Sequence, residues 1–219
     1  ASAIVLLDDD FGSIVKAILL GRRIYDNLRK AMGFVLAVHV PIAGMALLPL
    51  LFGLPVMFGP VHIAFLEMVI DPVCSLVFEA ESDERDVMNR PPRAPDAPLF
   101  SVPLVAWSII QGLLAFGFLA AVYGYALHQD LPVDEARSLV FFSLVFIIIG
   151  LIFVNRSFST SLRRALFRPN GAIVYVITIV PAALAALLLI PQVKDLFRFG
   201  NLHLDDLILA AAAGVALLI

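Results

Sequence analysis

Two carboxylates occur within an apolar stretch of the chain, residues 62–72, which reads HIAFLEMVIDP. They are Glu67 and Asp71, and Pro72 follows directly. Residues four apart lie on one face of a helix, one turn from each other. Pro72 lacks an amide donor and disfavours helical geometry at the residue before it, so we expect an unwound turn with free carbonyl oxygens beside the acids. Such oxygen ligands suit a hard cation or a proton, and the pattern predicts a cation site.

A histidine in the preceding apolar segment extends this candidate site. His39 lies two residues before Pro41, in AVHVPIAG, within a run that carries no charged residue. We expect His39 to face the interior of a helix bundle, where it could bind a metal ion, carry a proton or hydrogen-bond to Glu67 or Asp71. Two alternatives remain open. His39 could be a structural hydrogen-bonding residue, and the two acids could simply pair with other helices.

The composition indicates that membrane helices position these residues. The chain has 219 residues, of which 61% are hydrophobic and 15% charged, and its mean hydropathy is +0.98. A soluble domain carries about 25% charged residues, and a bilayer span needs about 20 apolar residues. The uncharged runs predict an all-α polytopic membrane protein. Its six transmembrane helices are expected near 31–52, 60–79, 100–126, 138–155, 171–190 and 204–219. A single cysteine rules out a disulfide framework.

Basic residues are unevenly distributed, and their distribution predicts the topology. Twelve of the 15 Lys and Arg residues fall in 1–30, 79–98 and 155–168. By the positive-inside rule, the N-terminal segment and the loops 80–98 and 156–169 are cytoplasmic. We therefore expect a multi-pass protein of the cell membrane, with the lipid bilayer as a partner. The basic tract RRALFR is typical of a cytoplasmic loop, so no nucleic-acid partner is expected.

The first 52 residues predict a strand followed by one long helix. AIVLL is typical of a buried strand, and apolar positions follow helical spacing from Ser13 onward. A helix over about 13–52 would be roughly 60 Å long, about twice the hydrocarbon thickness, so half of it should form a cytoplasmic stalk. The strand has no pairing partner in this sequence. We expect the chain to be a piece of a larger protein.

Four stretches together resemble a known family. AIVLLDDDF, GRRIYDNLRK, the acid-bearing helix after a short hairpin, and MNRPPR at 88–93 resemble the C-terminal transmembrane part of a P-type cation-transporting ATPase. The most similar branch contains the calcium, sodium/potassium and proton pumps. The resemblance covers the whole chain but is mostly topological after residue 100. It implies that the six spans are helices five to ten of a ten-helix, ATP-driven cation pump.

The resemblance also implies a domain organisation and partners. Residues 1–30 would end the phosphorylation domain and form the stalk, and 31–79 would be the hairpin with the cation site. Residues 80–99 would be a cytoplasmic loop, and 100–219 a four-helix support domain. The partner would be the upstream part of the same pump: the actuator, phosphorylation and nucleotide domains and helices one to four. ATP and Mg²⁺ would be cofactors of that parent pump. This chain lacks DKTGT, TGES and GDGxND, so no catalytic residue and no cofactor are expected in it.

Carried onto this chain, the calcium-pump pattern is only partly present. Asp71 matches the aspartate of the sixth helix, whereas Glu67 and His39 stand where those pumps have asparagine. Ile42 and Ile148 stand at or near positions where those pumps have acids. The predicted metal-binding residues are therefore Glu67, Asp71 and His39. With two acids of the calcium pattern missing, we expect one transported cation per cycle.

Two other functions are compatible with the residues. The chain could belong to a secondary transporter or channel with a proton-coupled acid pair, or it could be a non-transporting, membrane-anchored remnant. Secondary transporters often contain repeated halves, and this sequence shows no internal repeat. The long stalk and the unpaired strand favour the pump.

Overall fold

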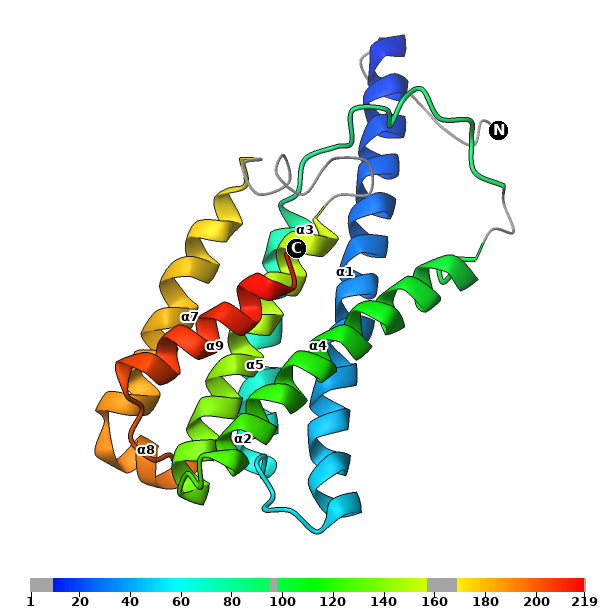
Figure 1. Ribbon diagram of the computed structural model, residues 1–219. Helices are drawn as coiled ribbons and strands as arrows, with labels where there is room; N and C mark the ends of the chain where they lie inside the picture. The colour runs from blue at the N-terminus through cyan, green and yellow to red at the C-terminus, as the bar shows by residue number, and fades with distance from the viewer. Residues whose placement is uncertain (1–9, 95–97, 157–168, 219) are drawn as a thin grey trace.

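The computed structural model describes residues 10–94, 98–156 and 169–218, and all regular elements within them are helical (Figure 1). The all-α class is thus confirmed for this part of the chain. The elements are α1 (Phe11–Phe52), α2 (Pro60–Phe65), η1 (Leu66–Ile70), α3 (Asp71–Glu79), α4 (Val102–His128), α5 (Val133–Asn155), α7 (Gly171–Leu189), α8 (Pro191–Phe197) and α9 (Leu204–Ala216). Of these, η1 is a π-helical turn. The strand expected at AIVLL lies outside the described residues.

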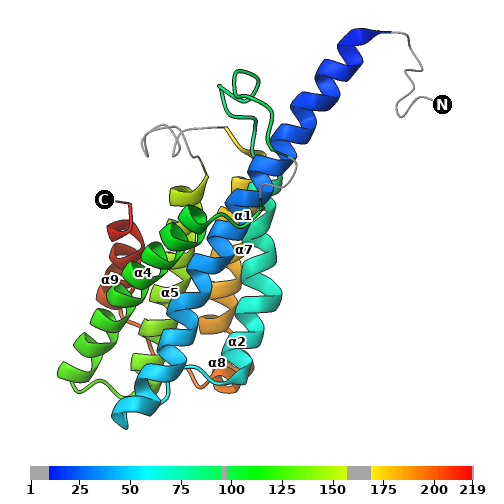
Figure 2. The ribbon, with the colours of Figure 1, turned by 90° about the vertical axis from the view of Figure 1, so that its right-hand side faces the viewer.

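Helix α1 is a single element of 42 residues, as the sequence predicts. It begins where the carboxylate of Asp10 accepts a hydrogen bond from the backbone N–H of Gly12, and it ends at Gly53. Gly53 has a φ of 64°, in the left-handed region that glycine adopts at low cost. The N-terminal part of α1 projects beyond the other helices as a stalk (Figures 1 and 2).

The bundle is built around α5, whose residues are buried almost continuously from Ala136 to Ile152. α5 packs against α9, α4 and α1, while α1 packs mainly against α4, and α3 against α7. The α5–α9 contact is close because two glycines meet there. A Cβ atom on Gly150 would lie 2.6 Å from the carbonyl oxygen of Gly214, so neither helix could approach this closely with a larger residue.

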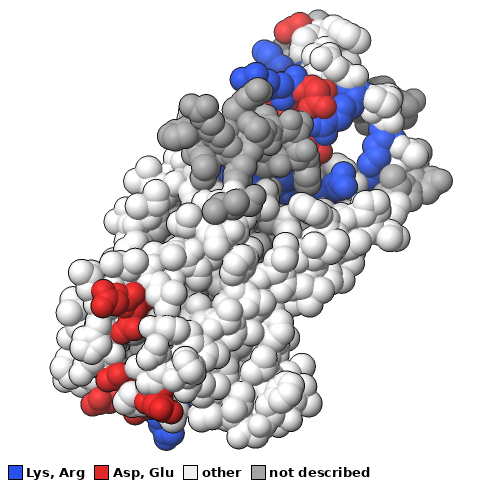
Figure 3. Space-filling model, viewed as in Figure 1, with Lys and Arg blue, Asp and Glu red and all other residues white. Residues whose placement is uncertain are grey.

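The described residues include four helices that are long and apolar enough to cross a membrane: α1, α4, α5 and α7. The chain is thus a multi-pass membrane protein. The other two predicted spans are less regular, because residues 60–79 are divided among α2, η1 and α3, and α9 has only 13 residues. Figure 3 shows Lys and Arg gathered mainly around the stalk. This distribution of basic residues is the one expected from the positive-inside rule.

Candidate functional site

Two of the predicted site residues are in contact. Nε2 of His39, on α1, lies 3.5 Å from Oε1 of Glu67, on η1. Their side chains are 49% and 43% exposed, so the expectation that His39 faces the interior of the bundle is wrong for this chain. The reason is the rotation of α1, which turns the neighbouring residues Ala37 and Val38 into the core instead.

Hydrogen bonding determines the chemistry of this pair. Nδ1 of His39 lies 2.8 Å from the backbone carbonyl of Val35, which can only accept, so Nδ1 must carry a proton. In a neutral imidazole, Nε2 then presents a lone pair to the Glu67 carboxylate, and two acceptors repel each other. The contact becomes favourable when a proton or a cation is shared between the two groups. The arrangement can therefore hold a positive charge.

The helix is distorted directly before Asp71 and Pro72, but not in the predicted way. We expected an unwound turn, whereas the backbone stays helical and widens into the π-turn η1. A π-helix pairs each amide with the carbonyl five residues earlier. Such a shift of pairing can accommodate the amide that Pro72 lacks without breaking the helix. Single π-turns are frequently found at functional sites, and Glu67 lies within this one.

The third predicted ligand, Asp71, is placed only by its backbone. It is the first residue of α3, but its side chain lies outside the described side chains. Among the side chains that the structure does describe, no three His, Cys, Asp or Glu residues lie close enough together to hold a metal ion. The metal site formed by Glu67, Asp71 and His39 stays a prediction.

The surroundings on the buried side of α1 are apolar. Ile42 and Ile148, which stand in place of acids of the calcium pattern, both belong to the hydrophobic core. Pro41 frees the backbone carbonyl of Ala37, but Gly112 of α4 packs directly against that oxygen. A Cβ on Gly112 would lie 2.6 Å from it. This carbonyl therefore faces α4, and the predicted ligands lie instead on the exposed side of α1, on η1 and at the start of α3.

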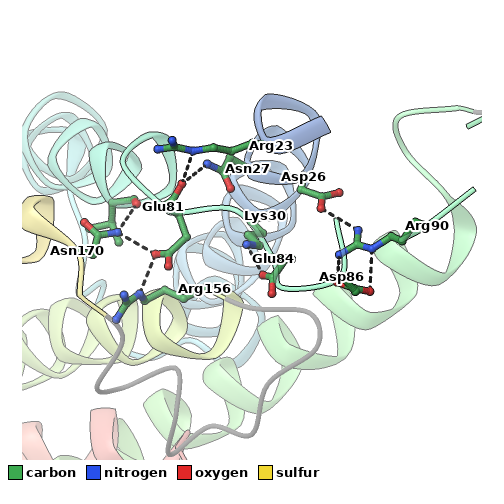
Figure 4. Close-up of polar contacts among 11 residues, drawn as sticks. Arg23, Asp26, Asn27, Lys30, Glu81, Glu84, Asp86, Arg90, Arg156 and Asn170 are labelled. Atoms are coloured by element: carbon green, nitrogen blue, oxygen red, sulfur yellow. Dashed lines mark hydrogen bonds and ion pairs between the residues drawn. The ribbon is translucent and has the colours of Figure 1, made fainter. Parts of the chain in front are cut away.

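A second polar cluster, which the sequence pattern did not predict, lies at the stalk end of the bundle (Figure 4). Glu81 follows α3 and is completely buried. Its carboxylate accepts hydrogen bonds from Nε of Arg156 at 3.0 Å and from Nδ2 of Asn170 at 2.8 Å. Its backbone carbonyl accepts from Arg23 at 2.9 Å and from Asn27 at 2.7 Å. One residue thus ties α3 to α1, α5 and the start of α7.

The stalk is also fastened to the segment after Glu81 by ion pairs. Nζ of Lys30 lies 2.6 Å from Oε1 of Glu84, and neither side chain is more than 1% exposed. Arg90 pairs with Asp26 of α1 at 2.8 Å and with Asp86 at 2.7 Å. The hydrogen bonds from Arg90 hold the pKa of Asp86 below its ordinary value. The sequence analysis used the basic residues here only to predict the topology. The acidic residues between 80 and 94 could have indicated that some of these basic residues form ion pairs.

A family model matches most of the chain. Residues 55–219 match the model described as cation transporting ATPase, C-terminus, which covers most of the chain and all elements from α2 to α9. The matched region includes Glu67, Asp71 and the buried Glu81.

Individual relatives extend the similarity toward the stalk. The chain is 27% identical to calcium-transporting ATPase 1 of Lactococcus lactis over 90% of its length, and 28% identical to calcium-transporting ATPase 1 of Bacillus cereus over 94%. It is 35% identical to human potassium-transporting ATPase alpha chain 2 over 56% of its length. The matches cover 22%, 25% and 12% of those relatives, respectively, so the chain spans a quarter or less of each.

Proposed function

This chain belongs to the family of cation-transporting ATPase C-terminal regions, and on that premise we propose that it is the membrane half of an ATP-driven cation pump. The observation that carries the proposal is the family match over residues 55–219. ATP and Mg²⁺ would act on the upstream part of the full-length protein, which would supply the actuator, phosphorylation and nucleotide domains and helices one to four. The chain itself would form the path of the cation.

The cation site would be built on Glu67, Asp71 and His39. Three features support this location: the π-turn at Glu67, the position of Asp71 one turn later, and the His39–Glu67 contact at 3.5 Å. Both contacting side chains lie on the surface of this chain, where the upstream helices could complete the ligand set. Because Ile42 and Ile148 are apolar core residues, too few acids remain for two divalent ions. One hard cation or one proton per cycle is the expected load.

Phosphorylation of the full-length protein would test the pump proposal. We expect ATP to transfer its γ-phosphate to the protein only when the transported cation is present. The measurement is incorporation of labelled phosphate during a screen of Ca²⁺, Mn²⁺, Na⁺, K⁺ and pH. Cation transport driven by a proton gradient, with no phosphorylated protein under any condition, would instead favour the secondary transporter.

Six spans would place both chain ends of this piece in the cytoplasm. In that topology α2, η1 and α3 together cross the membrane once, and α9 crosses along α5. In a protein whose Cys74 is replaced by serine, we expect Asp83→Cys and Asn89→Cys to react with a membrane-impermeant thiol reagent only after permeabilisation. Gln129→Cys, between α4 and α5, should react in intact cells. The reverse labelling pattern would contradict the topology.

A further inference from the structure

A cavity of about 720 Å³ lies where the stalk passes the segment that leads into α4. Among the described residues, its walls include Arg22, Arg29, Arg90 and Arg93, together with Tyr25 and one acid, Asp26. Figure 3 shows basic side chains around the hollow between the stalk and this segment. A volume of this size is in the range of small-molecule binding sites.

Part of the cavity wall is held rigidly. Nη1 of Arg22 donates to the backbone carbonyls of Val87 and Arg90, both at 2.7 Å. Arg90 in turn donates to Asp26 at 2.8 Å. These contacts join the stalk to the segment opposite it, so the cavity has a defined shape.

Two further guanidinium groups converge on one aromatic ring. The guanidinium carbon of Arg93 lies 4.3 Å from the centroid of the Tyr25 ring, and that of Arg29 lies 5.9 Å from it. Arginines held against an aromatic ring are partly pre-oriented, and their planar fork suits the oxygens of a phosphate group. On an ordinary solvent-exposed surface, by contrast, two positively charged arginines repel each other and tend to point apart.

The cavity lies close to the expected membrane surface. Ser101, which lines the cavity, is also the residue whose side chain caps the start of α4. α4 is long and apolar enough to span the membrane, so the cavity lies at the level where the chain enters the bilayer. The surrounding basic segments are those expected on the cytoplasmic side, where leaflets carry anionic lipids.

We propose that this cavity binds a phosphate-bearing anion, with Arg29 and Arg93 as its principal contacts. The phosphate could belong to the headgroup of an anionic phospholipid or to a small soluble compound, because both present the same oxygens to the arginines. Arg22 and Arg90, which hydrogen-bond across the wall, would also shape the site. The proposal is independent of transport.

The test uses the full-length protein in nanodiscs of neutral lipid. Phosphatidylglycerol is titrated into the nanodiscs in one arm, and inorganic phosphate into the buffer in the other, while the melting temperature is followed. We expect one arm to stabilise the protein. For Arg29→Gln combined with Arg93→Gln, the midpoint of that titration should move to higher ligand concentration, by roughly fivefold for each arginine removed. Arg85→Gln is the matched control, because Arg85 is exposed in the same segment and does not line the cavity.

Each outcome discriminates between sources or overturns the site. Stabilisation by phosphatidylglycerol alone assigns a lipid headgroup, and stabilisation by inorganic phosphate assigns a soluble phosphate compound. The combined change of Arg29 and Arg93 to lysine guards against misfolding, since it keeps the charge and should show an intermediate shift. The proposal is overturned if neither arm stabilises the protein. It is also overturned if the control shifts the midpoint as much as the double glutamine variant does.

Discussion

In the full-length pump, Glu67→Gln and Asp71→Asn should each abolish cation-dependent phosphorylation from ATP while leaving phosphorylation from inorganic phosphate largely intact. Each change keeps the size of the side chain but removes a charge. Glu67 is 43% exposed in this chain, but the upstream helices would cover it in the proposed full-length pump. Loss of a charged partner in a covered site costs about 3 kcal/mol, so cation affinity should fall roughly a hundredfold. In the proposed pump, forward phosphorylation would require a filled site and the backward reaction an empty one, so only the forward reaction should be lost. The measurement is phosphate incorporation in both directions against cation concentration.

One variant is the control for the acid pair, and a second tests the histidine beside Glu67. Glu79→Gln makes the same chemical change at an exposed residue at the end of α3, and it should leave both reactions unchanged. His39→Ala removes the group 3.5 Å from Glu67, and it should shift the pH dependence of forward phosphorylation more than the amount of folded protein. If Glu67→Gln and Asp71→Asn both keep wild-type cation affinity, the acids are structural and the proposed cation site is wrong.

The long helices were the most predictable part of the fold. Uninterrupted helical spacing predicted one helix over 13–52, and α1 runs over Phe11–Phe52. Length and lack of charge suffice for residues 31–52, because an apolar run of that kind has few other ways to satisfy its backbone in a membrane. For the charged stalk, the prediction rested on the helical spacing of its apolar residues. The rotation of α1 was not predictable in the same way. A helix with apolar residues on all sides has no single buried stripe, so the sequence did not reveal that His39 lies on the exposed side.

The backbone at the candidate site was only partly predictable, and its ligand set of Glu67, Asp71 and His39 stays a prediction. Pro72 guarantees a missing hydrogen bond, and this defect can be absorbed either by unwinding or by a π-turn. Whether the helix unwinds or forms a π-turn depends on packing along its whole length. The local sequence therefore predicts that the helix is distorted here, but not which distortion it adopts. The polar cluster at the stalk was hidden for another reason. Glu81 and Arg156 are 75 residues apart, and no periodic pattern links two such positions.

The buried pair of Lys30 and Glu84 should make a large contribution to stability. Lys30→Met should lower the free energy of unfolding by about 3–5 kcal/mol, because it leaves the Glu84 carboxylate buried without the ammonium group 2.6 Å away. The measurement is denaturant-induced unfolding of the full-length protein in lipid nanodiscs. Arg85→Met is the matched control. It removes a positive charge from an exposed side chain next to Glu84, and should change stability by no more than about 0.5 kcal/mol.

The double variant Lys30→Met with Glu84→Met separates burial from pairing. Removing both charges eliminates the cost of taking them out of water, and two methionines can fill much of the same volume, so the double variant should be more stable than Lys30→Met alone. That outcome requires a pair that is truly shielded from solvent between the stalk and the segment after α3. A loss of less than about 1 kcal/mol in the single variant would be typical of an exposed ion pair, and would contradict this contact between α1 and residues 80–94.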